Sequence, residues 1–447
     1  MTEQLDQSDL SERAGSLVEA ARRAGADAAD AVCIRGISLS VDVRLGKVEE
    51  TRRAEGDDFT LRAFVGTRSA AVSANVLTDP NELAERAVAM ARVAPENPYT
   101  GLADAEKLAE TFPDLDLLDP TIPSADELTE TALAAEDSAR AVEGVTNSGG
   151  ASAGWRLGGL VLATSHGFSG AYSASRFSVS ASAIAGSGTE MERDYEMEAR
   201  IHRADLPDPA EIGRKAAERA VRRLGPRQMA TGRGFVVYDP RVATGLIGHL
   251  VGAANGAAIA RKTSFLLNRL GTKVFSDGIR ISDDPFHKRG LASRPFDGEG
   301  VGAEPLDLVR DGVLMSWLLD SASARELGLV TNGRAMRGAS STSPGATNLT
   351  LAPGSLSPEA LLAEVGNGLY VTELIGHGAN LITGDYSRGA AGFAIENGEL
   401  THPVSEITIA GNLANMFKSM KPADDLVQRF SVNAPTVAVD GLMIAGR

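Results

Sequence analysis

The chain has 447 residues, with 44 Lys or Arg against 59 Asp or Glu, so its formal net charge is −15. That charge excludes a general nucleic-acid binder, because affinity for a phosphate backbone needs clustered positive charge. A single cysteine, Cys33, excludes an internal disulfide, and no apolar run approaches the roughly 18 residues of a membrane span. Residues 1–9 lack the features of a signal peptide, so we expect a cytoplasmic protein without a membrane partner.

Two successive helix–strands–helix patterns are predicted before residue 226. The first consists of a helix, three strands and a helix, over residues 8–25, 32–43, 59–65, 70–76 and 79–93. The second has the same order, over residues 124–142, 157–165, 171–185, 190–202 and 208–224. This repetition predicts an N-terminal α+β domain with an internal helix–strands–helix pseudo-repeat.

An acidic, proline-rich stretch separates the two patterns. From Glu96 to Asp137 there are twelve acidic residues and one basic residue, Lys107. Prolines within it interrupt both helix and strand. We therefore expect a solvated surface linker over about residues 95–124, with an acidic docking face as the alternative.

The pattern changes after Gly232 to short strands punctuated by glycine. A strand at 234–238 is followed by a long Gly/Ala-rich helix at 239–260. Later strands are expected at residues 347–351, 368–374, 392–395, 406–410 and 436–442. These features predict a β-rich, barrel-like domain with one buried helix, because the helix glycines permit close approach of other backbone. A boundary near Pro226 divides the chain into domains 1–226 and 227–447.

Familiar catalytic motifs are missing from the sequence. It contains neither a G-x-S-x-G nucleophile elbow nor a G-x-x-x-x-G-K-[ST] phosphate loop. The basic run from Arg214 to Arg227 is interrupted by Glu218 and is interpreted as a solvated helix end. His377 follows Glu373 by four residues, but in a predicted strand end, where residues four apart do not converge as metal ligands.

Several strings in the C-terminal half resemble the TldD/PmbA family, specifically its PmbA (TldE) branch. They are Gly248–Ala253 with Arg261–Leu266, Gly290–Gly300, Asp311–Leu314 with Trp317–Leu319, and Gly384–Phe393 with Ile395–Glu399. The resemblance implies a subunit of a bacterial cytoplasmic metallopeptidase that cleaves unfolded chains and leader peptides. The family is also named for modulation of DNA gyrase, but nothing basic in this sequence supports direct contact with DNA.

The TldD branch carries the zinc motif H-E-x-x-x-H and a later cysteine ligand. Alignment with that motif places Thr244 at the first histidine, Gly245 at the glutamate and His249 at the second histidine. The segment Phe430–Pro435, where the cysteine would fall, has no thiol. The resemblance therefore implies a chain with no catalytic residue and no metal of its own, and a TldD-type catalytic subunit that supplies the zinc.

Glycine-rich strands can accept an extended peptide as an added strand. The residues expected to line a peptide chamber are Glu373, His377, Asp385, Tyr386 and Arg388. Without its partner, the chain is expected to form a homodimer. Two alternatives remain at this point. One is an independent peptidase with a metal held by His249, His377 and Glu373 or Asp385; the other is a homodimeric protein that binds extended peptides without hydrolysing them.

Overall fold

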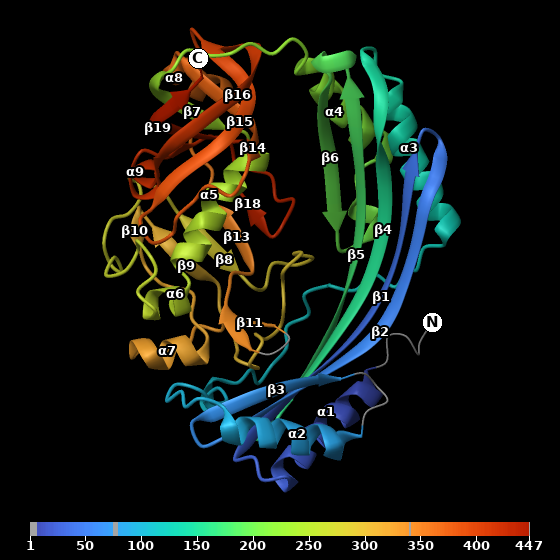
Figure 1. Ribbon diagram of the computed structural model, residues 1–447, viewed down its shortest axis with the longest axis vertical. Coiled ribbons are helices and arrows are strands. Elements are labelled where there is room, and N and C mark those ends of the chain that lie inside the picture. The colour runs from blue at the N-terminus through green and yellow to red at the C-terminus, as the bar shows by residue number, and fades with distance from the viewer. Residues whose placement is uncertain (1–6, 75–78, 339–340, 447) are drawn as a thin grey trace.

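The computed structural model describes residues 7–74, 79–338 and 341–446 (Figure 1). Its N-terminal half contains α1 (Ser8–Arg23), β1 (Ala28–Arg44), β2 (Lys47–Val65), β3 (Arg68–Ala74), α2 (Pro80–Val93), α3 (Ala125–Arg140), β4 (Val145–Thr164), β5 (Ser169–Ala185), β6 (Glu192–Arg200) and α4 (Pro209–Arg222). Short 3₁₀ turns lie at Ala105–Lys107, Gly188–Glu190 and Arg203–Asp205. Residues 75–76 of the third predicted strand lie outside the described residues.

The six strands form one antiparallel sheet in the order β3-β2-β1-β4-β5-β6. Strands β1 to β3 come from the first repeat and β4 to β6 from the second, and β1 pairs with β4 at the centre of the sheet. Helices α1 and α2 pack together, as do α3 and α4. The α+β fold and its helix–strands–helix pseudo-repeat are confirmed.

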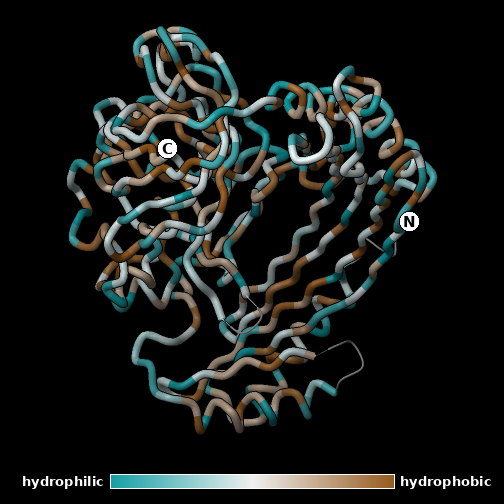
Figure 2. Tube along the Cα trace, turned by 45° about the horizontal axis from the view of Figure 1, so that its top comes forward, coloured by the Kyte–Doolittle hydropathy of each residue, from teal (hydrophilic) through white to brown (hydrophobic). Residues whose placement is uncertain are grey.

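Strand alternation gives the sheet two different faces. The outer face is covered by helices: Cys33 is buried near α1 and α2, and Trp155 near α3 and α4. Burial raises the pKa of the Cys33 thiol to about 12, so it stays protonated. The inner face carries small residues such as Ser38, Gly154 and Ser178. Figure 2 shows the sheet arching so that its concave side is turned to the C-terminal half.

The C-terminal half contains β7 (Gly232–Tyr238), α5 (Pro240–Ala253), α6 (Gly256–Ala260), β8 (Ile281–Asp284), β9 (Leu306–Arg310), β10 (Val313–Leu314), α7 (Ser321–Leu327), β11 (Ala335–Arg337), β12 (Thr342–Pro344), β13 (Asn348–Leu351), α8 (Pro358–Val365), β14 (Gly368–Ile375), β15 (Asp385–Glu396), β16 (Glu399–Asn412), α9 (Leu413–Lys418), β17 (Lys421–Pro422), β18 (Val432–Asn433) and β19 (Val437–Ala445). The strand order β16-β15-β14-β7-β19-β17, together with pairing of β16 to β19, closes a five-stranded barrel. A second sheet has the order β10-β9-β8-β13-β18. The predicted barrel-like domain is confirmed.

The expected helix at 239–260 is two helices. Its first part, α5, is buried against the barrel through Leu246, Ile247 and Leu250. The helix is interrupted at Asn255. The Asn255 side chain accepts from the Ala258 N–H at 3.2 Å and donates to the Pro344 carbonyl at 2.6 Å. These bonds make Asn255 the N-cap of α6. The sequence pattern missed this break because apolar residues continue through it.

The connection between α2 and α3, residues 94–124, differs from the expected solvated linker. The Ala109 N–H donates to the Gly300 carbonyl at 2.9 Å, and the Gly302 N–H donates to the Lys107 carbonyl at 3.0 Å. Farther along, Leu115 and Leu117 are buried. The acidic composition of the connection did not indicate that Leu115 and Leu117 would be buried. Their burial packs part of the connection between the two halves.

A buried charge cluster joins the sheet to the C-terminal half. Asp30 on β1 lies 2.5 Å from Arg62 on β2 and 2.6 Å from Arg337 on β11. Burial alone would raise the pKa of Asp30, but the charges of Arg62 and Arg337 outweigh it and lower the pKa to about 2. The carboxylate therefore stays ionised while it holds both arginines.

This cluster predicts acid sensitivity. Because the pKa of Asp30 is lower in the folded chain than its ordinary value of 3.8, its contribution to stability is complete above pH 4 and is lost as the pH falls towards 2. We expect a loss of about 2 kcal/mol in the free energy of unfolding over that window. Urea unfolding at several pH values measures it. Asp30→Asn should be less stable at pH 7 and show a shallower acid slope; an unchanged slope would contradict the assignment.

Within the described residues, no helix is long and apolar enough to cross a membrane.

Candidate functional site

A pocket of about 440 Å³ lies where β6 of the N-terminal half meets α5, β14 and β15 of the C-terminal half. We call it the interdomain pocket. It is lined by Ser182, Arg193, Asp194, Tyr195, Arg223, Arg241, Val242, Thr244, Gly245, Thr372, Glu373, Leu374 and Arg388. Four predicted site residues, Thr244, Gly245, Glu373 and Arg388, are among them, so the pocket is the candidate site.

The start of α5 positions two of these residues. Asp239 caps the helix by accepting from the Arg241 N–H at 3.0 Å, and Pro240 occupies the first turn. The next turn carries Thr244, whose hydroxyl donates to the Arg241 carbonyl at 3.0 Å. A Cβ added to Gly245 would meet no heavy atom within 4 Å. Space is therefore open where the TldD motif has a glutamate.

His249 lies one turn farther along α5 and is half-buried. Its ring meets the edge of the Tyr386 ring, with centroids 5.8 Å apart. Burial, and then the positive charge of Arg388, lower the pKa of His249 below its ordinary value. His249 is therefore a packed, neutral imidazole at pH 7.

Ion pairs between the two halves form one wall of the pocket. Arg223, the C-cap of α4, lies 2.6 Å from Glu373 on β14. Arg241 lies 2.8 Å from Asp194 on β6, and its guanidinium stacks 5.7 Å from the Tyr195 ring centroid. Burial alone would lower the pKa of Arg241, but Asp194 raises it above its ordinary value. These two bridges fix the relative position of the halves at the site.

Two other pocket arginines, Arg193 and Arg388, differ from Arg223 and Arg241 in their surroundings. In the described part of the chain, neither Arg193 nor Arg388 forms an ion pair. The Nε of Arg388 lies 3.5 Å from the Ile375 carbonyl oxygen. With Arg223 and Arg241 neutralised, the pocket keeps excess positive charge, which suits carbonyl or carboxylate oxygens.

The structure brings together only part of the predicted chamber lining. Glu373 and Arg388 face the pocket, and Tyr386 is buried beside His249. Asp385 is exposed and accepts from the Thr383 hydroxyl at 2.7 Å. His377 is exposed in the turn after β14.

The residues present do not fit a zinc ion. Thr244 and Gly245 offer no ligand of the kind zinc prefers, and His249 supplies one imidazole. Across the described residues, no group of three His, Cys, Asp or Glu side chains is arranged to hold a metal. The alternative site of His249, His377 and Glu373 or Asp385 is not assembled.

Sequence reasoning missed Arg193, Asp194, Arg223 and Arg241. The run that contains Arg223 was interpreted as a solvated helix end. That interpretation holds for Arg214 and Lys215, which pair with exposed glutamates on α4. It is wrong for Arg223, because the sheet and barrel bring acidic partners from distant segments. The clustered basic residues after Glu218 were the available signal.

Comparison with known proteins agrees with this architecture. Three family models match: PmbA/TldA metallopeptidase domain 1 over residues 29–91, the central domain over 118–224 and the C-terminal domain over 231–446. Metalloprotease PmbA of Escherichia coli O157:H7 is 40% identical over 426 residues, covering 94% of this chain and 93% of that protein. A PmbA homolog of Haemophilus influenzae is 37% identical over 445 residues, covering 98% and 96%.

Solved structures share the fold. A crystal structure of a candidate modulator of DNA gyrase from Bacteroides thetaiotaomicron superposes with a TM-score of 0.91 at 28% identity, covering 98% of this chain and 99% of that one. TldE from Thermococcus kodakarensis has the same fold, with a TM-score of 0.84 at 21% identity and coverage of 97% and 99%. The chain is a member of the PmbA/TldD metallopeptidase family.

Proposed function

We propose that this chain is a PmbA (TldE)-type subunit of a heteromeric cytoplasmic metallopeptidase that cleaves unfolded or leader peptides. In this proposal the chain holds no catalytic zinc, and a TldD-type partner supplies it. Relatives named Metalloprotease PmbA, which match over nearly the full chain, support a contribution to peptide hydrolysis.

The observation that carries the proposal is the surface of α5 at the interdomain pocket. A hydrolytic zinc site needs about three protein ligands and a base that activates water. Thr244 and Gly245 provide neither ligand nor base, and the open space beside Gly245 holds no substitute carboxylate. Glu373 is held by Arg223 at 2.6 Å. In this proposal α5 lines a pocket but lacks the groups that hydrolysis at a zinc ion requires.

What the chain contributes is peptide binding and part of the enclosure. Arg193 and Arg388 present guanidinium donors that can bind peptide carbonyl or carboxylate oxygens. The ion pairs Arg223–Glu373 and Arg241–Asp194 hold these donors in place across the two halves. A partner with the intact H-E-x-x-x-H motif would act on a peptide presented in this way.

Reconstitution tests the proposal. The purified chain, a purified TldD-type partner and their mixture are assayed for zinc content and for cleavage of an unfolded peptide. After dialysis against a mild chelator, we expect about one zinc per partner and none per copy of this chain. Cleavage should be fastest in the mixture. One zinc per chain together with cleavage by the chain alone would identify an independent peptidase instead.

The same preparation tests assembly. Alone, the chain should form a homodimer, since the surface retained for a partner can accept a second copy. Light scattering over a hundredfold dilution series is expected to give twice the protomer mass. A mass that stays at 46.6 kDa would contradict this. A dimer that binds peptides and adds nothing to cleavage in the mixture would identify a peptide-binding protein without a hydrolytic role.

A further inference from the structure

The inner face of the sheet carries two arginines directly opposite each other. Arg156 on β4 pairs in register with Arg176 on β5, and both side chains are exposed. Opposed residues in an antiparallel ladder have Cα atoms about 4.5–5.5 Å apart. Like charges in that arrangement repel and destabilise the sheet. The pair therefore costs stability unless an anion lies between the guanidinium groups.

No carboxylate within residues 7–74, 79–338 and 341–446 fills that role. The neighbours of the pair on the same face are all small and uncharged: Ser38, Gly154, Gly158, Ala174 and Ser178. Among the described residues, neither arginine forms an ion pair. Solvent reaches both side chains, yet partial burial, and then the charge of Arg156, lower the pKa of Arg176 below its ordinary value. The Arg176 guanidinium is thus partly desolvated, and no carboxylate of the described residues pairs with it.

The pair faces the C-terminal half. On β5, Tyr172 shares the face of Arg176 and packs edge-on against Phe296 of the C-terminal half, with centroids 5.4 Å apart. Farther along the same face, Ser182 lines the interdomain pocket. Strand geometry places Arg176 about 13 Å from Tyr172 and about 20 Å from Ser182. By register the pair lies between these two contacts along β5. The concave side of the sheet is the side turned to the C-terminal half (Figures 1 and 2).

Charges are sorted between the two faces of this part of the sheet. On β6, the acidic residues occupy the alternate positions, which belong to the face opposite the inner one. Each has an arginine partner: Asp194 with Arg241, Glu196 with Arg219 and Glu198 with Arg429. The inner residue between the first two is Tyr195, opposite Ser182. The inner face of β4, β5 and β6 thus carries Arg156, Arg176 and Arg193 and no Asp or Glu. In a chain of net charge −15, this local excess of arginine is a specific feature.

We propose that Arg156 and Arg176 together bind the carboxylate of an Asp or Glu side chain in an extended, unfolded peptide, so that acidic peptides are the preferred class. The inference rests on the proposed function, in which the chain binds peptides. A carboxylate between the two guanidinium groups accepts charge-assisted hydrogen bonds from both and removes their repulsion. Both arginines are exposed and their neighbours on the face are small, so a ligand can reach the guanidinium groups from solvent.

Binding to the chain alone tests the inference. Two fluorescein-labelled, C-terminally amidated, unstructured peptides that differ only by Glu or Gln at the same positions are titrated and followed by anisotropy at low salt. The Glu peptide should bind about tenfold more tightly than the Gln peptide, a preference worth about 1.4 kcal/mol. Added salt should reduce it. The same peptides with free C-termini show whether a terminal carboxylate binds equally well, and an acid preference that appears only with free C-termini overturns the side-chain assignment.

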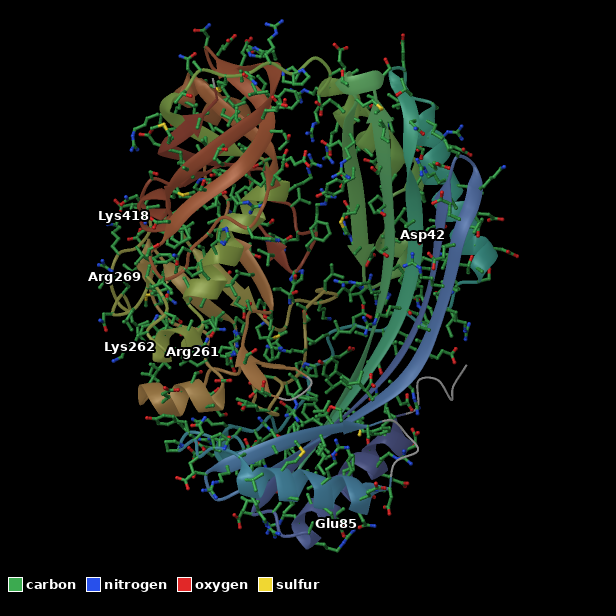
Figure 3. The ribbon with its side chains drawn as sticks, in the orientation of Figure 1. Asp42, Glu85, Arg261, Lys262, Arg269 and Lys418 are labelled. Atoms are coloured by element: carbon green, nitrogen blue, oxygen red, sulfur yellow. The ribbon has the colours of Figure 1, made fainter. Side chains whose placement is uncertain are left out.

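Matched variants separate the pair from overall charge. R156S/R176S should abolish the preference for Glu and leave the melting temperature unchanged or higher, because repulsion is removed. The control R261S/R269S removes the same charge from exposed side chains on the side of the C-terminal half farther from the sheet (Figure 3) and should keep the preference. An equal affinity for both peptides, or a preference that survives R156S/R176S, overturns the inference. Cleavage of both peptides at one rate by the reconstituted complex overturns it too and leaves the proposed function intact.

Discussion

Replacement of Gly392 by alanine is expected to lower the free energy of unfolding by about 3 kcal/mol or more. A Cβ at this position would lie 1.8 Å from the Tyr370 carbonyl oxygen and 2.9 Å from the Val371 Cα. Both atoms belong to the backbone of β14, so the clash cannot be relieved by rotation of a side chain. Register shifts occur beside Gly392 in the pairing with both neighbouring strands. The substitution forces apart the strands that carry Glu373 and Arg388.

The same substitution at Gly245 is the matched control. There the added methyl group meets open space, and the residue lies within α5. Because alanine is a better helix former than glycine, Gly245→Ala should be neutral or stabilising by up to about 1 kcal/mol. Chemical denaturation of both variants measures the difference. If the free energy of unfolding of Gly392→Ala lies within 1 kcal/mol of the value for the unsubstituted chain, the predicted clash between β14 and β15 is contradicted.

Arg334→Met is expected to destabilise the chain by about 3–5 kcal/mol. Arg334 and Asp283 are fully buried, and the arginine Nε lies 2.5 Å from the Asp283 Oδ2. The other arginine donors reach the Asn332 carbonyl at 2.8 Å and the Glu304 carbonyl at 2.6 Å. Asp283 also accepts from the Thr347 N–H at 2.6 Å. Removal of the cation leaves a buried carboxylate without its counter-charge.

A double-mutant cycle identifies the cause. Asp283→Asn keeps an acceptor for the Thr347 N–H but removes the charge, so Arg334→Met with Asp283→Asn should cost clearly less than the sum of the two single changes. Arg214→Met, which breaks an exposed pair with Glu218, serves as the surface control and should change stability little. Additive losses in the cycle would show that packing, and not charge, dominates at Arg334.

Local signals in the sequence predicted most of the regular structure. Helix caps such as Asp79-Pro80 and Asp208-Pro209 fixed helix starts to within a residue. The first part of β2 was not predicted, because residues 47–58 are mostly charged and exposed and form a strand only through pairing with β1. Strand formation there depends on a partner and not on composition.

The candidate site was predictable only in part. The family motif identified Thr244, Gly245 and His249 because the three lie close together in the sequence. Arg223 and Glu373 meet only after the sheet and barrel have folded, so no local pattern links them. The opposed arginines are also invisible in sequence, because their proximity depends on the register of β4 with β5. Contacts that depend on strand register can be identified only when the fold is known.

The position of β19 in the barrel has a consequence for synthesis on the ribosome. β19 pairs with β7 on one side and with β16 and β17 on the other. In the sequence, however, most of the C-terminal half lies between β7 and β19. At elongation rates of roughly 5–20 residues per second, β7 waits on the order of ten seconds for that partner. During this interval the barrel is an open sheet with unpaired edges, which attract chaperones or other nascent chains. The six strands of the N-terminal sheet and the helices that cover its outer face all lie before residue 223, so this half can fold first.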